Sequence, residues 1–285
     1  MLSTRECPLC LSVIPLKAVK CAHCASDLKQ RIFHNQDMIK IICSRLAAAC
    51  CAVLLTAGAA RAQYYFDAEG GSVWAGHNTV KVPLDGGTRF SLTDELKSEA
   101  APYARLRLGR RWAKSDLSFL AAPLTLRSSG RLDKPVIFNG ASFPGGVPVE
   151  AVYRFNSYRV KYLYEFHRTE TLTLRWGGAL KLRHAGVTLS GGGASAESKN
   201  TGFVPLAAFS LDYAFRPGWL LLLDIEALGA PQGRAEDVML ALSRELRPGL
   251  RARAGYRFLE GGSGAGEVYT FAWLNYLLAG LTWEF

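Results

Sequence analysis

The amino-acid sequence predicts an all-β protein built around a single antiparallel β-barrel of about ten strands, with eight or twelve strands left open. From residue 63 onward, apolar and polar side chains alternate with a period of two, as in strands that have one apolar face. Tight turns and longer, glycine-rich connections alternate along this region. All seven cysteines lie before residue 52, so the predicted barrel contains no disulfide.

The alternation is long and regular in several segments. In residues 172–184 the even positions are mainly apolar and include Leu172, Leu174, Trp176, Leu180 and Leu182. Residues 203–215 place Phe203, Phe209 and Phe215 on one face, and residues 250–258 place Arg251, Arg253 and Arg257 opposite apolar positions. Such repeats predict ten strands, over residues 66–79, 102–113, 116–127, 149–166, 170–189, 202–215, 218–229, 235–246, 249–260 and 267–285.

The connections between these strands are of two kinds. Arg216-Pro217-Gly218 and Arg247-Pro248-Gly249 predict tight turns, because proline presets φ and glycine accepts positive φ. Short links are also expected at 113–116 and 167–170. The longer connections are expected to be loops, over residues 80–101, 128–148, 190–201, 230–234 and 261–266.

Ahead of the barrel, residues 38–62 have the pattern of a secretory signal peptide. Lys40 and Arg45 precede an apolar stretch, and Ala60-Arg61-Ala62 forms a cleavage site of the A-x-A type. The apolar run of residues 46–60 is too short for a transmembrane helix. We therefore expect three segments: residues 1–37, the signal peptide 38–62 and the barrel 63–285.

Residues 1–37 carry two CxxC pairs, Cys7 with Cys10 and Cys21 with Cys24. Four thiolates at this spacing can close a tetrahedral Zn²⁺ site, and so short a segment has no core without the ion. The segment resembles the small zinc ribbons found as tails on some bacterial membrane proteins. The alternative is that translation starts at Met38, because a folded zinc module ahead of an export signal would impede secretion.

The chain has a formal charge of +10, but its distribution does not favour nucleic acid as a partner. Residues 1–62 hold eight basic and three acidic residues, so the barrel segment carries only half of the excess. Its basic residues alternate with apolar ones and do not form a patch. We expect no nucleic-acid partner, and no cofactor for the barrel.

Period two alone does not say which face of the strands is inward. The export signal, the lack of cysteine, the alternation of short and long connections and the aromatic residues near strand ends favour a transmembrane barrel with apolar side chains outward. The aromatic residues expected at the membrane interfaces are Tyr158, Tyr162, Tyr164, Phe166, Trp176, Trp219 and Trp283.

The last strand carries the most specific resemblance. It reads VYTFAWLNYLLAGLTWEF, with Leu281, Trp283 and Phe285 at alternate positions, and it resembles the C-terminal signal of bacterial outer-membrane barrels. The resemblance implies insertion into the cell outer membrane by the barrel assembly machinery, with periplasmic chaperones as escorts and lipopolysaccharide among the contacting lipids. The stretches YRFNSYR, GFVPL and GYRFLEGG resemble a family of outer-membrane barrels, which implies architecture and no activity. We expect a monomer.

With apolar side chains outward, strand parity predicts a set of charged residues in the lumen. This predicted lumen charge network comprises Arg105, Arg107, Arg159, Lys161, Arg175, Lys181, Arg183, Asp212, Asp224, Glu226, Asp237, Arg251, Arg253 and Arg257. The same face carries Asp67, Glu69, Arg111, Glu165 and Glu245. Because the acidic strands lie between basic ones, and ten strands enclose a narrow lumen, we expect the blocks to form ion pairs across it.

Three functions follow from this prediction. The first is a structural or interaction role with an ion-paired, closed lumen, and the second is a narrow porin-like channel for small solutes. The third is an enzyme, either a lipid A-modifying hydrolase or acyltransferase or a surface protease, for which the barrel offers only His77, His167 and His184. His184 has lipid-facing parity but no serine two residues away, so no catalytic residue is assigned.

Overall fold

The computed structural model describes residues 4–7, 10, 12–15, 20–25, 63–231, 233–264 and 268–285. The chain divides into two compact units, Met1–Ala60 and Arg61–Phe285. The predicted signal peptide, 38–62, lies outside the described residues. No helix in the described part of the chain is long and apolar enough to cross a membrane.

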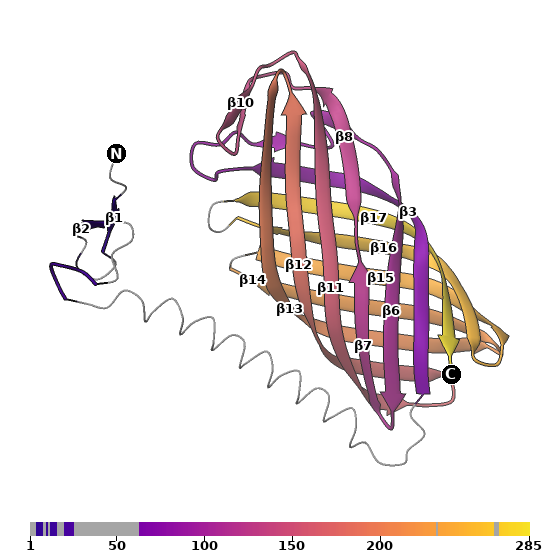
Figure 1. Cartoon of the computed structure of the whole chain (residues 1–285). Coiled ribbons are helices and arrows are strands. Elements are labelled where there is room, and N and C mark those ends of the chain that lie inside the picture. The colour runs from indigo at the N-terminus through magenta and orange to yellow at the C-terminus, as the bar shows by residue number, and fades with distance from the viewer. Residues whose placement is uncertain are drawn as a thin grey trace. The chain divides into compact units, whose positions relative to one another are not determined.

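The second unit is a closed antiparallel β-barrel of ten wall strands, which confirms the predicted fold class (Figure 1). Strands β11 and β12 pair along their whole length, and β17 pairs with β3 to complete the ring. The wall strands are β3 (Gln63–Lys81), β6 (Ala101–Trp112), β7 (Ser115–Ala122) with β8 (Thr125–Arg131), β11 (Pro148–Arg168), β12 (Leu172–Gly191), β13 (Ala194–Arg216), β14 (Trp219–Ala230), β15 (Gly233–Arg247), β16 (Leu250–Ser263) and β17 (Tyr269–Glu284).

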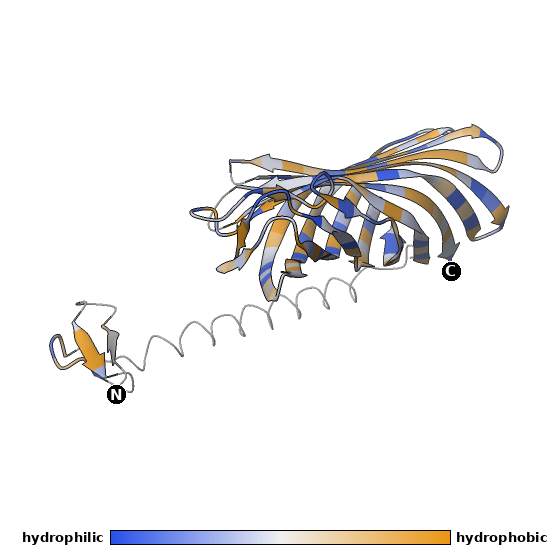
Figure 2. Ribbon diagram, turned by 90° about the horizontal axis from the view of Figure 1, so that it is seen from above, coloured by the Kyte–Doolittle hydropathy of each residue, from blue (hydrophilic) through white to orange (hydrophobic). Residues whose placement is uncertain are grey.

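The two faces of the wall differ as the alternation predicts. Large apolar side chains such as Trp176, Phe203 and Leu277 are more than 60% exposed on the outside, while the residues between them face the lumen. Figure 2 shows the alternation of hydrophilic and hydrophobic positions along the strands. An exposed apolar surface around a closed barrel is costly in water and favourable in a lipid bilayer.

The barrel has two unlike ends. At the turn end, where β3 begins and β17 finishes, neighbouring strands are joined by tight turns. Gly218 and Gly249 have φ of 74° and 78°, as predicted for the two Arg-Pro-Gly turns. The opposite end is the loop end, which carries residues 82–100 and 132–147.

Several connections at the loop end are more ordered than predicted. Residues 190–201 are not a loop, because β12 and β13 remain paired as far as Gly191 and Ala194. The link is a two-residue turn of Gly192 and Gly193, with φ of 59° and 82°. The expected loops 230–234 and 261–266 are likewise shortened, since β15 pairs with β14 to Gly233 and with β16 to Ser263.

The strand predicted over residues 116–127 is divided by Pro123. Proline has no N–H to donate to a ladder, and beyond it the chain continues as β8, which pairs with β11 but not with β6. Asn156 compensates locally, because its side-chain oxygen accepts a hydrogen bond from the Leu124 amide at 3.2 Å.

The long connections at the loop end build an apolar core. They contain the short strands β4 (Phe90–Ser91), β5 (Leu96–Ser98), β9 (Val136–Phe138) and β10 (Ala141–Phe143). Their buried side chains pack in one cluster with inward-facing residues of the wall strands, among them Val73, Leu126 and Leu189. The lumen is therefore apolar toward this end, whereas the sequence predicted a polar interior throughout.

The seam between β17 and β3 generates a prediction about Phe285. Its backbone exchanges two hydrogen bonds with Tyr64, at 2.8 and 2.9 Å, and the two rings stack at 6.2 Å. Deleting Phe285 should destabilise the refolded barrel by about 2 kcal/mol, because about 1 kcal/mol is lost per hydrogen bond. Phe215→Ala, which removes an exposed aromatic ring away from the seam, is the matched control. Equal stability of the two variants in guanidinium titrations of lipid-refolded protein would contradict the role of the seam.

Candidate functional site

Eleven charged side chains form a continuous ion-pair network across the lumen, which we name the charge belt. They come from six strands, β3, β6, β11, β14, β15 and β16, and they are Asp67, Glu69, Arg105, Arg107, Arg159, Lys161, Asp224, Glu226, Asp237, Arg253 and Arg257. Nine of the eleven belong to the predicted lumen charge network, and Asp67 and Glu69 share its face.

Asp237 is at the centre of the belt. Its carboxylate lies 2.5 Å from Arg257 Nη1, 2.7 Å from Arg159 Nη2 and 3.1 Å from Arg105 Nη2. Glu69 on β3 contacts two of these arginines, at 3.0 Å from Arg257 Nη2 and 3.6 Å from Arg105 Nε. The side chains of Asp237 and Glu69 are 1% and 2% exposed. Such burial is tolerable only because each carboxylate meets several cations.

The pairing crosses the lumen, as the opposite signs of distant strands predicted. Arg159 and Lys161 on β11 reach Glu226 on β14 at 2.6 and 3.2 Å, although β12 and β13 lie between these two strands in the wall. Lys161 also holds Asp224 at 2.7 Å. Because the ion pairs join opposite walls, they fill the middle of the lumen with side chains.

Below the belt, toward the turn end, the lumen contains a polar cavity of about 470 Å³. We name it the vestibule. Its wall includes Arg175, which pairs with Asp212 at 2.7 Å, and Arg111, which pairs with Asp116 and Glu284 at 3.0 and 2.6 Å. The vestibule is a part of the lumen in which small solutes have room.

Five residues of the predicted network lie outside the belt. Arg175 and Asp212 pair in the vestibule, and Arg251 contacts Glu245 at 3.4 Å near the turn end. Lys181 and Arg183 lie on the other side of the belt, toward the loop end, and line a second pocket. Within the described residues neither of these two cations has an ion-pair partner.

Some site residues were missing from the prediction. Asp116 accepts hydrogen bonds from Tyr65 at 2.9 Å and from Arg111, and Glu284 joins the same cluster. Parity over residues 115–122 could have placed Asp116 inward beside Ser118. The hydroxyl of Tyr103 lies 3.3 Å from Glu69. This contact could not be predicted from the sequence, because an inward-facing tyrosine is equally typical of apolar packing.

The three histidines of the barrel do not form a recognisable catalytic group. His184 is exposed, and its Nδ1 lies 2.8 Å from the Thr201 hydroxyl on the neighbouring strand. His77 makes a similar contact with Thr79 at 2.9 Å, and His167 is exposed at the turn end. Among the described residues, none of these rings is hydrogen-bonded to a carboxylate.

In the first unit, β1 (Thr4–Glu6) and β2 (Val13–Pro15) pair, and four cysteines gather beside them. The Sγ atoms of Cys7, Cys10, Cys21 and Cys24 all lie within 4.8 Å of one another. The Cys7–Cys24 and Cys10–Cys21 pairs are 3.8 and 3.6 Å apart. A tetrahedral zinc ion with Zn–S bonds of about 2.3 Å places its sulfur atoms about 3.8 Å apart, so the arrangement fits this metal.

The thiols of this cluster have unlike pKa values. Hydrogen bonds from the side chain and backbone of Ser12 lower the pKa of the Cys10 thiol. Backbone hydrogen bonds from Cys24 and His23 act in the same direction on Cys21, but burial and the neighbouring thiols outweigh them and raise its pKa to about 11. Bringing four thiolates together without a cation is therefore unfavourable.

Comparisons with known proteins give short or distant similarities. No protein-family model matches the chain. It is 58% identical over 26 residues to the large-conductance mechanosensitive channel of Pelodictyon phaeoclathratiforme and 59% identical over 27 residues to that of Chlorobium chlorochromatii. These stretches are 9% and 10% of this chain, which spans only 17% of the length of each channel.

Three of the solved structures that match this chain are outer-membrane proteins. The Ail protein of Yersinia pestis matches 78% of this chain and 98% of its own, at 11% identity and a TM-score of 0.35. The protease OmpT of Escherichia coli matches 78% and 97%, at 10% identity and a TM-score of 0.44. OprG of Pseudomonas aeruginosa matches 78% and 95%, at 8% identity and a TM-score of 0.30. The barrel assignment rests on the strand pairing described above.

The loss of a carboxylate from the charge belt should lower the free energy of unfolding more than the loss of a carboxylate outside it. Asp237→Asn leaves three buried arginines short of a counter-charge, and it should lower the free energy of unfolding by about 3 kcal/mol or more. Asp212→Asn, which removes one partly exposed pair with Arg175, should cost less than about 1 kcal/mol. Guanidinium unfolding in lipid vesicles, followed by tryptophan fluorescence, measures both. Equal losses of unfolding free energy in the two variants would contradict the larger contribution of the belt to stability.

Proposed function

We propose that residues 63–285 form an integral outer-membrane barrel with a closed lumen, which acts through its surface and its loop end and not as an open pore. The observation that carries this function is the charge belt, whose ion pairs join opposite walls at mid-lumen. An open channel would keep some of these charged groups apart and hydrated. Here each belt carboxylate contacts at least one cation within 4 Å.

The location in the outer membrane is part of the proposal. It is supported by the exposed apolar outer surface, by the closed wall and by the C-terminal strand, where Leu281, Trp283 and Phe285 are each at least half exposed. The proposed contacts are lipid, including lipopolysaccharide, along this surface. The barrel assembly machinery is the proposed partner that reads the C-terminal strand.

The vestibule supports a second candidate function, a narrow channel for small solutes. It is polar and holds room for solutes on the turn-end side of the belt. Conduction would then require the belt to rearrange. For an enzyme, the related features among the described residues are the contacts of His184 with Thr201 and of His77 with Thr79, and neither ring has a carboxylate to orient it.

A conductance measurement distinguishes the proposed closed barrel from the alternative of a narrow channel. Protein recovered in the carbonate-washed outer-membrane fraction and reconstituted in planar bilayers should show no steady conductance. The double variant Asp224→Asn with Glu226→Gln removes two belt carboxylates, so it should weaken the closure and give intermittent steps. Asp212→Asn is the control, because its carboxylate pairs with Arg175 outside the belt. Regular single-channel steps from the unmodified protein would favour the transport function.

We also propose that Cys7, Cys10, Cys21 and Cys24 bind one Zn²⁺ ion, on the strength of their tetrahedral sulfur spacing. Full-length chain made in the cytoplasm should bind about one Zn²⁺, and Cys7→Ser should lower the affinity by at least tenfold. Cys43→Ser, outside the two CxxC pairs, is the matched control. Chelator competition measures the affinity, and the same loss in both variants would contradict this site.

A further inference from the structure

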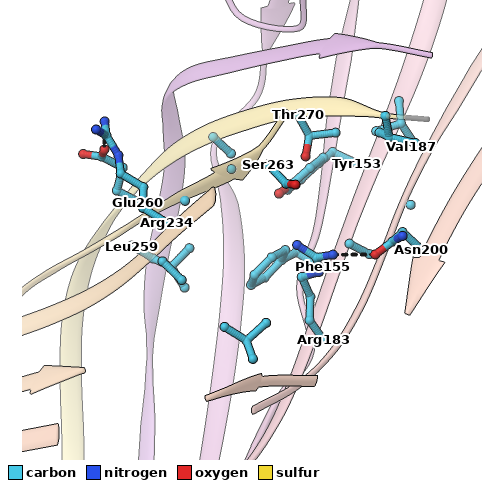
Figure 3. A pocket seen from close by; sticks show the side chains of 18 of the residues that line it. Tyr153, Phe155, Arg183, Val187, Asn200, Arg234, Leu259, Glu260, Ser263 and Thr270 are labelled. Atoms are coloured by element: carbon cyan, nitrogen blue, oxygen red, sulfur yellow. Dashed lines mark hydrogen bonds and ion pairs between the residues drawn. The ribbon is translucent and has the colours of Figure 1, made fainter. Parts of the chain in front are cut away.

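A second pocket lies in the lumen between the charge belt and the loop end, and we name it the loop-end pocket (Figure 3). It has a volume of about 100 Å³ and lies between β11–β13 on one side and β15–β17 on the other. Phe155, Val187, Leu259 and Ala272 supply apolar walls. Figure 3 shows Phe155 beside Arg183, with Leu259 and the Arg234–Glu260 ion pair across the space.

The wall of the barrel is incomplete beside this pocket. The pairing of β13 with β14 reaches only to Ala207 and Ala227, so residues 194–206 of β13 pair with β12 alone. Ser198, Asn200 and Val204 of this segment line the pocket together with Arg234 and Ala235 of β15. The pocket therefore lies next to a lateral interruption of the sheet, through which a small molecule could enter without crossing the belt.

Two cations face this pocket without a carboxylate partner. Lys181 is 2% exposed, and none of the ion pairs among the described residues includes it. It is held only against the ring of Phe155, with Nζ 5.8 Å from the centroid. Arg183 donates from Nη2 to Asn200, but its buried Nε has no partner.

The belt does not supply the missing counter-charge. Its five carboxylates, Asp67, Glu69, Asp224, Glu226 and Asp237, are shared among six belt cations. Asp237 and Glu226 are the acidic groups that act on Lys181, but neither lies within ion-pair distance of it. A buried ammonium without an anion is costly, so the pocket has a strong preference for a ligand with one negative group.

We propose that the loop-end pocket binds a small monocarboxylate with an apolar body, the carboxylate meeting Lys181 Nζ and Arg183 Nε. The volume sets the size of the body, because an apolar cavity that holds a benzene molecule has a volume of about 150 Å³ and this pocket is smaller. A short-chain fatty acid such as butyrate matches this space, whereas an aromatic acid or a lipid with several acyl chains does not. The proposal does not depend on whether the lumen conducts ions.

Butyrate and its uncharged analogue 1-butanol test the proposal. Protein in phosphatidylcholine nanodiscs, which lack competing anionic lipid, is titrated with each compound by calorimetry. Butyrate should bind at least tenfold more tightly than 1-butanol, because only the carboxylate neutralises the buried charge. Inorganic phosphate should bind more weakly than butyrate, since it has no apolar body.

Substitutions of Lys181 test whether its ammonium group binds the carboxylate of the ligand. Lys181→Met keeps the length of the side chain and should weaken butyrate binding at least tenfold, whereas Lys181→Arg should retain it within about threefold. Lys114→Met is the matched control, because Lys114 lies in a turn at the opposite end of the barrel. Heat-modifiable migration on gels shows that each variant is folded.

Three results would overturn the proposal. They are equal butyrate affinity in Lys181→Met and the unmodified protein, equal affinity of the unmodified protein for butyrate and 1-butanol, and no binding of butyrate. Phosphate binding as tight as that of butyrate would point to a bare anion or lipid-headgroup site instead, and it would also overturn the monocarboxylate. If Lys181→Met does not fold, the comparison of butyrate with 1-butanol on the unmodified protein decides.

Discussion

The structure depends on one constraint, that charges enclosed by a narrow barrel must neutralise one another. Ten strands leave little room for water between their inward side chains, and an isolated ion there would be expensive. The carboxylate of Asp237 is stable because three arginines surround it, and those arginines are stable because Glu69 and Glu226 lie beside them. No member of the belt can be understood as a single pair.

The same constraint divides the lumen into three levels. The charge belt separates the polar vestibule of the turn end from the apolar core that residues 82–100 and 132–147 build at the loop end. Lys181 lies opposite the belt residue Arg159 in the register of β11 and β12, and Arg183 lies two positions farther toward the loop end, where the surroundings change from ionic to apolar. The boundary between the ionic belt and the apolar loop-end core is thus also the place where two cations lack a carboxylate partner.

Much of the barrel could be predicted from the sequence, because a period of two is imposed by strand geometry itself. Strand parity alone placed Arg159, Asp224 and Asp237 inward, and the Arg-Pro-Gly turns fixed the ends of the strands around them. Parity gives the face of a strand but not the distances across the lumen, so it could not say that Arg159 meets Asp237 while Lys181 meets no carboxylate. The hairpin of residues 190–201 was missed because its glycines and polar residues are equally typical of loops, and the apolar loop-end core was missed because its residues lie outside any regular repeat.

The sequence separation within the belt has a consequence for folding. Arg105 and Asp237 are 132 residues apart, and Glu69 and Arg257 are 188 residues apart. A chain that has formed only its neighbouring hairpins can pair Asp237 with Arg257, but it holds Arg105 and Arg159 without Asp237 and holds Glu69 without Arg257, because these contacts join strands that are far apart in sequence. The charged side chains must stay hydrated until the first and last strands meet, so insertion into lipid and neutralisation of the interior have to occur as a single cooperative event.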